Sequence, residues 1–256
     1  MIGIQPQWPA PAGVAALCTV RGGGVSAEPF ADFNLAAHVG DDPAAVAANR
    51  RKLIERCPGL SAISWLKQVH GTGVAVADAS AEPVADAVFS REQGLGCAVL
   101  TADCLPVLFC DRGATRVAAA HAGWRGLCAG VLENTVASLA TPPSELMAWL
   151  GPAIGPDRFE VGPEVREAFL EAAPVVLREA TERCFAAGRR PGHFLADLYQ
   201  LARLRLRTVG VESVYGGGFC TFAESELFYS YRREPVTGRM ASLIYLLPDT
   251  ETLAVA

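Results

Sequence analysis

The chain has little lysine and no excess of positive charge. Lys52 and Lys67 are the only lysines among 22 basic residues, and the formal net charge is −5. Proteins that bind nucleic acid use clustered basic residues to neutralise phosphates. The composition therefore predicts no nucleic-acid partner.

Long apolar runs are also missing. No stretch approaches the roughly 20 apolar residues that span a bilayer, and the first nine residues lack the basic and continuous apolar segments of a signal peptide. We predict a cytoplasmic protein with no membrane partner. No long apolar helix demands a second subunit, so we also predict a monomer.

The eight cysteines form no Cys-x-x-Cys pair and no disulfide-like rhythm. In a cytoplasmic chain of this size most cysteines are small, reduced, buried hydrophobic residues. Several standard motifs are absent too: the Gly-x-Ser-x-Gly elbow, the phosphate-binding loop, His-Glu-x-x-His, the dinucleotide fingerprint and the zinc deaminase signature.

What is present is ample material for a core, because 51% of the 256 residues are hydrophobic. We expect a single domain over residues 1–256 with a mixed α/β fold, a layered sheet flanked by helices. Asp42-Pro43 is typical of a helix start. The other helices are predicted over 126–139, 163–172 and 193–208, and strands over 14–20, 61–69, 73–77, 85–89, 97–103, 105–110, 115–121, 146–150, 211–215 and 241–247.

Three polar residues follow apolar segments where strands are expected to meet loops: His70, Cys104 and His121. Residues two apart in a strand share a face, which places each of the three at the end of such a row. Cys104 is expected to share a face with Ala98 and Leu100, and His121 with Val117 and Ala119. Two imidazoles and a thiolate are ligands that zinc prefers, and three protein ligands leave a fourth position open. Two other interpretations remain: satisfied polar core residues, and a thiolate–imidazole nucleophile pair.

Further candidates surround this set. The glycine turn after His121 and the start of the next helix suit an anion, which Arg125 could grip. The aromatic and arginine residues from Phe228 to Arg233, with Thr237-Gly-Arg239, are typical of a strand edge or of a base-binding surface. His38 is either a loop histidine or a group near the substrate.

The motifs together resemble the laccase-domain (YfiH-like) family, also described as polyphenol oxidases, whose members are described as purine nucleoside phosphorylases with adenosine deaminase activity. The resemblance runs in order along nearly the whole chain. Its motifs are Arg21-Gly-Gly-Gly-Val-Ser, Asn34-Leu-x-x-His-Val-Gly-Asp with Asn49-Arg50, Lys67-Gln-Val-His-Gly, Thr101-Ala-Asp-Cys-Leu-Pro-Val, Ala119-Ala-His-Ala-Gly-Trp-Arg-Gly, Gly151-Pro-Ala-Ile-Gly-Pro with Phe159-Glu-Val-Gly, and Phe228-Tyr-Ser-Tyr-Arg-Arg with Thr237-Gly-Arg.

The resemblance implies that His70, Cys104 and His121 are both the catalytic residues and the metal ligands, with Zn²⁺ as the usual metal and Cu²⁺ as a second possibility. It also implies that four residues face the substrate and phosphate: Arg21, Asn34, Arg50 and Arg125. Phe159 and Phe222 stand where many members would have tyrosine.

The implied activity is phosphorolysis of adenosine, inosine and methylthioadenosine, with adenosine deamination, so the expected partners are a purine nucleoside and phosphate. Zinc would lower the pKa of a water molecule to about 7. No general acid is evident, and Asp103 is expected on the opposite strand face from Cys104. The rivals are a hydrolase that edits UDP-MurNAc-linked peptidoglycan precursors, a copper-dependent polyphenol oxidase and a non-catalytic binding module.

Overall fold

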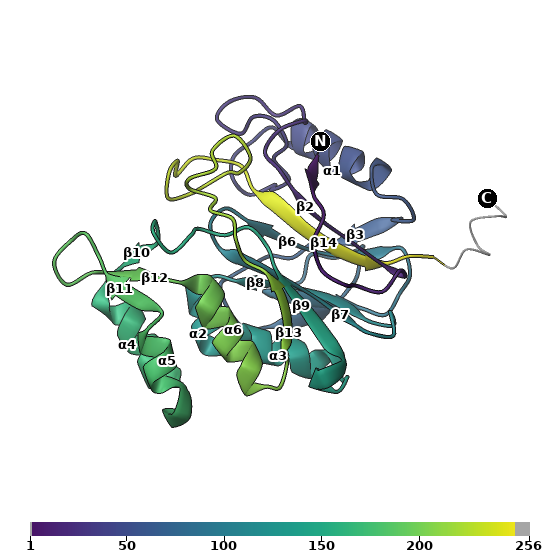
Figure 1. Cartoon of the computed structure of the whole chain (residues 1–256). Coiled ribbons are helices and arrows are strands. Elements are labelled where there is room, and N and C mark those ends of the chain that lie inside the picture. The colour runs from purple at the N-terminus through teal and green to yellow at the C-terminus, as the bar shows by residue number, and fades with distance from the viewer. Residues whose placement is uncertain (1, 249–256) are drawn as a thin grey trace.

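Two β-sheets lie face to face in the middle of the molecule, and helices cover the outer face of each (Figure 1). The computed structural model describes residues 2–248. The first sheet has the order β1-β2-β14-β6-β3. Its strands are β1 (Gly3–Ile4), β2 (Val14–Thr19), β14 (Met240–Leu246), β6 (Leu95–Thr101) and β3 (Ala62–Ser64).

The second sheet has the order β13-β9-β7-β8-β5-β4 and mixes parallel and antiparallel pairs. Its strands are β13 (Ser213–Gly216), β9 (Leu146–Leu150), β7 (Leu105–Asp111), β8 (Val117–Ala122), β5 (Ala87–Ser90) and β4 (Val74–Val76). A small third sheet contains β10 (Glu160–Val161), β12 (Phe194–Ala196) and β11 (Phe185–Ala187). This mixed α/β architecture confirms the predicted fold class.

The helices divide between the two outer faces. Helix α1 (Pro43–Glu55) covers the first sheet, and α2 (Trp124–Ala129), α3 (Val131–Leu139) and α6 (Leu198–Thr208) cover the second (Figure 1). Helices α4 (Pro163–Ala172) and α5 (Arg178–Glu182) accompany the small sheet. None of the helices within residues 2–248 has the length and apolar character needed to cross a membrane.

Because side chains alternate along each strand, three apolar layers form: one between the two sheets and one on the outer face of each sheet. In β7, Leu108 and Cys110 pack between the two sheets, whereas Val107 and Phe109 pack against the helices on the other side. All seven residues of β7 are buried. A strand that is buried on both faces reads as a continuous apolar run rather than as an alternating one, which is how residues 105–110 appear in the sequence.

The strands predicted over 105–110, 115–121, 146–150 and 241–247 are confirmed to within two residues. Three predicted elements need correction. The strand expected over 61–69 ends at Ser64, and residues 193–208 contain β12 before α6. The helix expected over 126–139 is two helices, because Gly130 has a left-handed φ of 104° that ends α2 before α3 begins.

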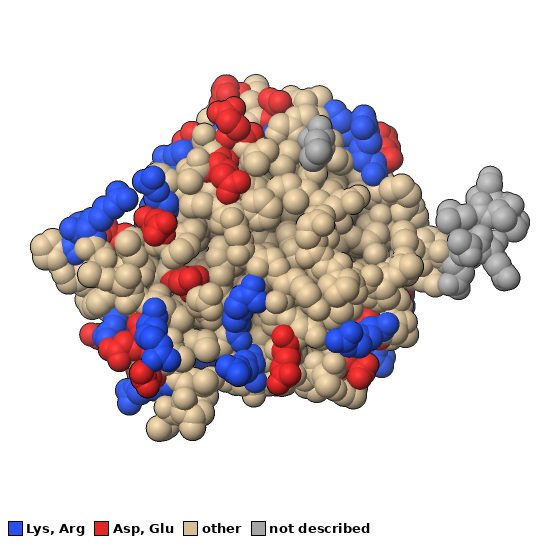
Figure 2. All heavy atoms as spheres, in the orientation of Figure 1, with Lys and Arg blue, Asp and Glu red and all other residues tan. Residues whose placement is uncertain are grey.

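Most cysteines are buried free thiols, as the composition predicts, and charges of both signs mix on the surface (Figure 2). All eight cysteines are free thiols, and five of them are buried. On the face in Figure 2, basic and acidic side chains of the described residues are interspersed around a neutral centre. This face has no continuous basic surface within residues 2–248.

Gly130→Ala is expected to destabilise the fold by about 1–2 kcal/mol, because an L side chain disfavours the left-handed region. An added Cβ would meet its nearest atom, Arg205 Nη2, at an ordinary 3.6 Å, so the cost comes from the backbone. Urea unfolding measures it. Gly218→Ala is the matched control, because its Cβ would enter open space and its φ is not left-handed. Equal stability of the two variants would contradict the left-handed backbone conformation of Gly130.

Candidate metal centre

His121 lies near the end of β8, with its side chain on the face between the two sheets. The alternation predicted for Val117, Ala119 and His121 is confirmed, since Val117 and Ala119 pack in that layer. The imidazole is 3% exposed, and its Nδ1 lies 2.8 Å from Asp86 Oδ1. With Nδ1 committed to a carboxylate, Nε2 is the ring nitrogen left for a ligand.

His70 comes from a turn rather than from a strand end. Its φ of 60° is left-handed, and the turn is held by the same buried carboxylate of Asp86. The backbone N–H groups of Val69, His70 and Gly71 donate to Asp86 at 3.3, 2.9 and 2.6 Å. One side chain thus fixes the backbone of one histidine and the ring of the other.

Cys104 lies in the connection from β6 in the first sheet to β7 in the second. The prediction that it shares a strand face with Ala98 and Leu100 is wrong, because β6 ends at Thr101 and Asp103 has a φ of 89°. Ala98 and Leu100 pack on the α1 side. The turn at Asp103 changes the direction of the chain and brings Cys104 beside His70 and His121.

The three donor atoms all lie within 4.8 Å of one another, and Cys104 Sγ is 3.8 Å from His70 Nε2. Gly123 makes this approach possible. A Cβ built on Gly123 would lie 2.8 Å from His70 Cδ2 and 3.1 Å from Cys104 Sγ. Residue 123 therefore has to be glycine for the ligands to keep these positions.

The electrostatics of the cluster favour a thiolate. Burial acts to raise the pKa of Cys104, but the charge and hydrogen bond of His121, with help from His70, outweigh it and lower the pKa to about 6. Burial acts to lower the pKa of His121, whereas the Cys104 thiolate and Asp86 raise it to about 9. Before any metal binds, the two groups are thus a thiolate–imidazolium pair near neutral pH.

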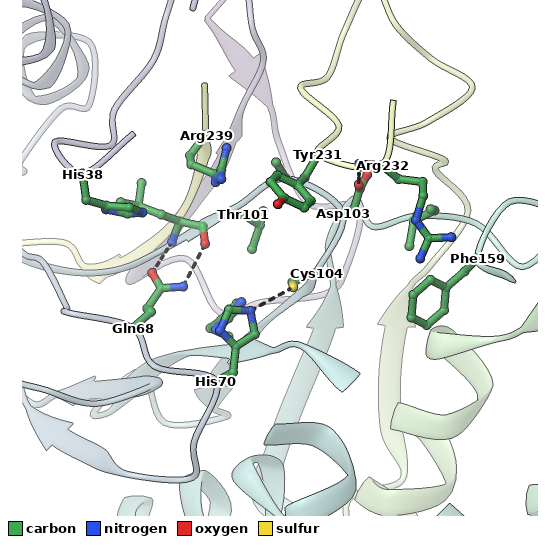
Figure 3. Close-up of a pocket in the computed structure, with 14 residues that line it drawn as sticks. His38, Gln68, His70, Thr101, Asp103, Cys104, Phe159, Tyr231, Arg232 and Arg239 are labelled. Atoms are coloured by element: carbon green, nitrogen blue, oxygen red, sulfur yellow. Dashed lines mark hydrogen bonds between the residues drawn. The ribbon is translucent and has the colours of Figure 1, made fainter. Parts of the chain in front are cut away.

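The cluster opens into a cavity of about 400 Å³, shown in Figure 3. Aromatic, arginine and small polar side chains surround the three donors. The lining residues are His38, Gln68, His70, Leu100, Thr101, Ala102, Asp103, Cys104, His121, Ile154, Phe159, Tyr231, Arg232 and Arg239. The cavity thus gives a metal ion at the donors an open side, and its volume lies in the range of small-molecule sites.

Two polar side chains fix the walls of this cavity. Gln68 extends the edge of β6: its amide group donates to Leu100 O and accepts from Leu100 N, both at 2.8 Å (Figure 3). Asp103 accepts from Thr221 Oγ1 and from the backbone N–H of Arg232, both at 2.6 Å. Asp103 thus holds two C-terminal loops against the site, and both its carboxylate oxygens are engaged.

The four residues expected to face the substrate lie outside the lining of this cavity. Arg21 donates to Ser225 O and stacks on Tyr229, and Arg125 is exposed and stacks on Trp124 at 4.4 Å. The turn and helix start after His121 are confirmed, but α2 has six residues only. The phosphate role of Arg125 stays a prediction.

Asn34 and Arg50 lie behind the cavity wall. Asn34 is fully buried, and its Oδ1 accepts from the backbone N–H of Arg239 at 2.9 Å. Arg50 donates to Leu35 O and stacks on Trp65 at 4.1 Å. Neither side chain reaches the cavity directly, although Asn34 positions a residue that does.

Sequence reasoning missed Asp86 altogether. The signal was a lone acidic residue inside the apolar run from Val84 to Phe89, because a buried carboxylate needs partners. For His38 the sequence left a loop histidine and a group near the substrate open, and for Arg239 a strand edge and a base-binding surface. Both residues line the cavity. Burial, followed by the charges of Arg239 and Arg50, lowers the pKa of His38, so its imidazole is neutral at pH 7.

The donor set fits a metal ion of the zinc or copper type. In a tetrahedral zinc site, Zn–S and Zn–N bond lengths place ligand atoms roughly 3.5 Å apart, close to the 3.8 Å between Cys104 Sγ and His70 Nε2. The carboxylate behind His121 is the partner that metal-bound histidines usually have. The softness of the ligand atoms does not distinguish zinc from copper, because both metals bind imidazole and thiolate.

A mixed α/β sandwich with a His-His-Cys cluster facing a cavity defines the class of protein. The chain belongs to the family described as multi-copper polyphenol oxidoreductase laccase, whose model matches residues 15–247. The match contains every strand of the second sheet, all of the first sheet beyond the start of β2, and all three cluster residues.

Relatives and solved structures cover almost the whole chain. A protein of Pseudomonas aeruginosa named purine nucleoside phosphorylase is 58% identical over 243 residues, 95% of this chain and 98% of its own. The Escherichia coli protein named purine nucleoside phosphorylase YfiH is 54% identical over 246 residues, 95% and 98% of the two chains. A solved Neisseria meningitidis structure has a TM-score of 0.90 at 50% identity, covering 97% of this chain and all of its own.

Gly123→Ala is expected to weaken zinc binding at least about tenfold, because its Cβ would displace His70 and Cys104 from their positions, and displaced ligand support typically costs 10- to 100-fold in affinity. Competition with a chromophoric chelator measures the affinity. The backbone at Gly123 (φ −59°) accepts alanine, so the unfolding midpoint should change little. Unchanged zinc affinity would contradict the described packing.

In the metal-free protein, alkylation of Cys104 by iodoacetamide is expected to have a midpoint near pH 6, because the reactive thiolate forms above the pKa of about 6. His121→Asn should move the midpoint up towards the ordinary value. Peptide mass spectrometry follows each cysteine separately. Cys128, also part-buried but with a raised pKa, serves as the internal control. A Cys104 midpoint above pH 8 would refute the thiolate assignment.

Proposed function

We propose that this chain is a zinc-dependent purine nucleoside phosphorylase that acts on adenosine, inosine and methylthioadenosine and also deaminates adenosine. The observation that carries the proposal is the cluster of His70, Cys104 and His121 at the wall of a nucleoside-sized cavity. Relatives named purine nucleoside phosphorylase at 58% and 54% identity support the substrate class.

A bound zinc ion would supply Lewis acidity, lowering the pKa of water and polarising a substrate oxygen. The chain's own residues do the rest. Asp86 keeps both histidines in position, and Nε2 of His70, Nε2 of His121 and Sγ of Cys104 would hold the ion. The ring of Phe159, beneath Arg232 in a stacked pair at 5.4 Å, offers a surface for a purine base.

Two reactions share these residues in the proposal. Phosphate attacks C1′ of the ribose and the purine leaves, which gives ribose 1-phosphate and the free base. In deamination, water attacks C6 of adenosine and ammonia leaves, which gives inosine. Asp103 serves as a positioning residue and not as the proton donor, since both its oxygens already accept hydrogen bonds.

Polyphenol oxidation fits the site less well. Within residues 2–248 the His, Cys and acidic residues form a single group of three metal-type donors, whereas a multi-copper oxidase needs several copper ions. His38 lines the cavity but does not belong to this group. The peptidoglycan-precursor hydrolase would use the same activated water and remains the outcome to expect if nucleosides do not react.

Adenosine incubated with the zinc-loaded protein should give adenine and ribose 1-phosphate with phosphate present, and inosine without it. Liquid chromatography separates the products. Cys104→Ala is expected to lose zinc and both activities together, by at least about 100-fold, because it removes one of three ligands. Cys128→Ala, at a part-buried cysteine outside the cavity, should keep both.

Intact adenosine under both conditions would refute the nucleoside assignment and favour the precursor hydrolase. Full activity of Cys104→Ala would refute the metal mechanism even if nucleosides react. These two failures are separate, because the first concerns the substrate and the second concerns the site.

A further inference from the structure

Arg239 is an unpaired cation in the wall of the cavity. Its guanidinium points into the cavity from the side opposite His70 in Figure 3. None of the ion pairs within residues 2–248 includes Arg239. A part-buried guanidinium without a carboxylate is unusual, because desolvation of a charge needs compensation.

The side chain is held firmly even though its charge is not neutralised. Nη1 donates to Thr237 O at 2.8 Å and to Gly238 O at 2.9 Å, and the guanidinium lies 5.7 Å from the centre of the Tyr231 ring. The backbone N–H of Arg239 donates to the buried Asn34 side chain. The residue is therefore anchored at its backbone, at one terminal nitrogen and at its face.

Part of the guanidinium fork remains unused. Of the five N–H donors of arginine, the two on Nη1 are engaged by the carbonyl groups, and neither Nε nor Nη2 has a protein acceptor among residues 2–248. Nε and Nη2 form the edge of the fork that binds two oxygens of a phosphate in parallel. The free edge and the open cavity suit a tetrahedral oxyanion.

The neighbouring groups also favour a phosphate at this end. His38 lies beside Arg239 at the same wall (Figure 3), and its neutral ring offers a further donor or acceptor. Arg50 lies behind His38 but is paired with Glu82 at 3.2 Å, which leaves Arg239 as an unpaired cation at this end of the cavity. The negative groups that act on Arg239, Cys104 and Asp103, are respectively a metal ligand and a carboxylate already holding two hydrogen bonds, so neither replaces an anion in the cavity.

We propose that Arg239 binds the phosphate co-substrate, with Asn34 as its positioning residue, and that the nucleoside lies with its ribose towards Arg239 and its base towards Phe159. This inference rests on the proposed phosphorylase function. It places phosphate inside the cavity, whereas Arg125, the residue that the sequence favoured, lies on the exposed surface of α2.

The first measurement is the unfolding temperature of the zinc-loaded protein with inorganic phosphate, against potassium chloride at equal ionic strength. Phosphate should raise it for the wild type, because a ligand that binds only the folded state stabilises it. Arg239→Gln should abolish the rise. Arg158→Gln, at an exposed arginine that stacks on Phe222 outside the cavity, should keep it.

The second measurement is steady-state phosphorolysis of adenosine. Arg239→Gln should raise KM for phosphate about 10- to 100-fold, the value of lost hydrogen bonds to a charged group, and leave KM for adenosine within about twofold. Arg239→Lys keeps the charge without the fork, so its KM for phosphate should lie between those of the wild type and Arg239→Gln. The deaminase reaction uses no phosphate and shows whether each variant is folded and zinc-loaded.

An unchanged KM for phosphate in Arg239→Gln would overturn the proposal, as would loss of the phosphate response in Arg125→Gln instead. UDP tests the other source of the same chemistry: protection that depends on Arg239 with UDP but not with phosphate would also overturn it. An Arg239-dependent response to phosphate in a protein that cleaves no nucleoside would support the anion site and refute the proposed function.

Discussion

The site depends on one buried carboxylate. Asp86 is fully buried, and it accepts hydrogen bonds from three successive backbone N–H groups of the His70 turn and from the ring of His121. These bonds offset the cost of removing a charge from water, and they lower the pKa of the carboxyl group against the effect of burial. The His70 turn and the end of β8 are thereby fixed to one carboxylate.

The way in which the two sheets are connected explains why His70, Cys104 and His121 meet at one place. His70 and Cys104 both lie in connections that leave the first sheet and enter the second, and His121 ends a strand beside them. Each connection must turn sharply, and the left-handed residues His70 and Asp103 make these turns. Backbone strain of this kind persists where surrounding bonds enforce it, which here are the bonds to Asp86 and Asp103. The geometry of the donors is therefore set by the way the two sheets are joined.

Much of this could be predicted from the sequence, although not always for the right reason. The donor chemistry of the three ligands predicted a cluster that the structure brings together, yet strand alternation placed Cys104 on the wrong face because the left-handed turn at Asp103 is invisible to a two-residue period. For Arg239 the sequence left a strand edge and a base-binding surface open, because its missing ion partner becomes evident only after folding. A single backbone conformation decides the first case, and long-range packing decides the second.

The position of β14 has a consequence for how the protein is made. This strand lies between β2 and β6 in the first sheet, and Ser242 pairs with Cys18, 224 residues earlier. Until residues 240–246 leave the ribosome, β2 lacks its central neighbour and exposes an open sheet edge, a state that is prone to aggregation. Arg239 directly precedes β14, so the last strand within residues 2–248 both completes the first sheet and brings Arg239 to the wall of the cavity. A nascent chain thus acquires the complete cavity wall only after residues 239–246 have left the ribosome.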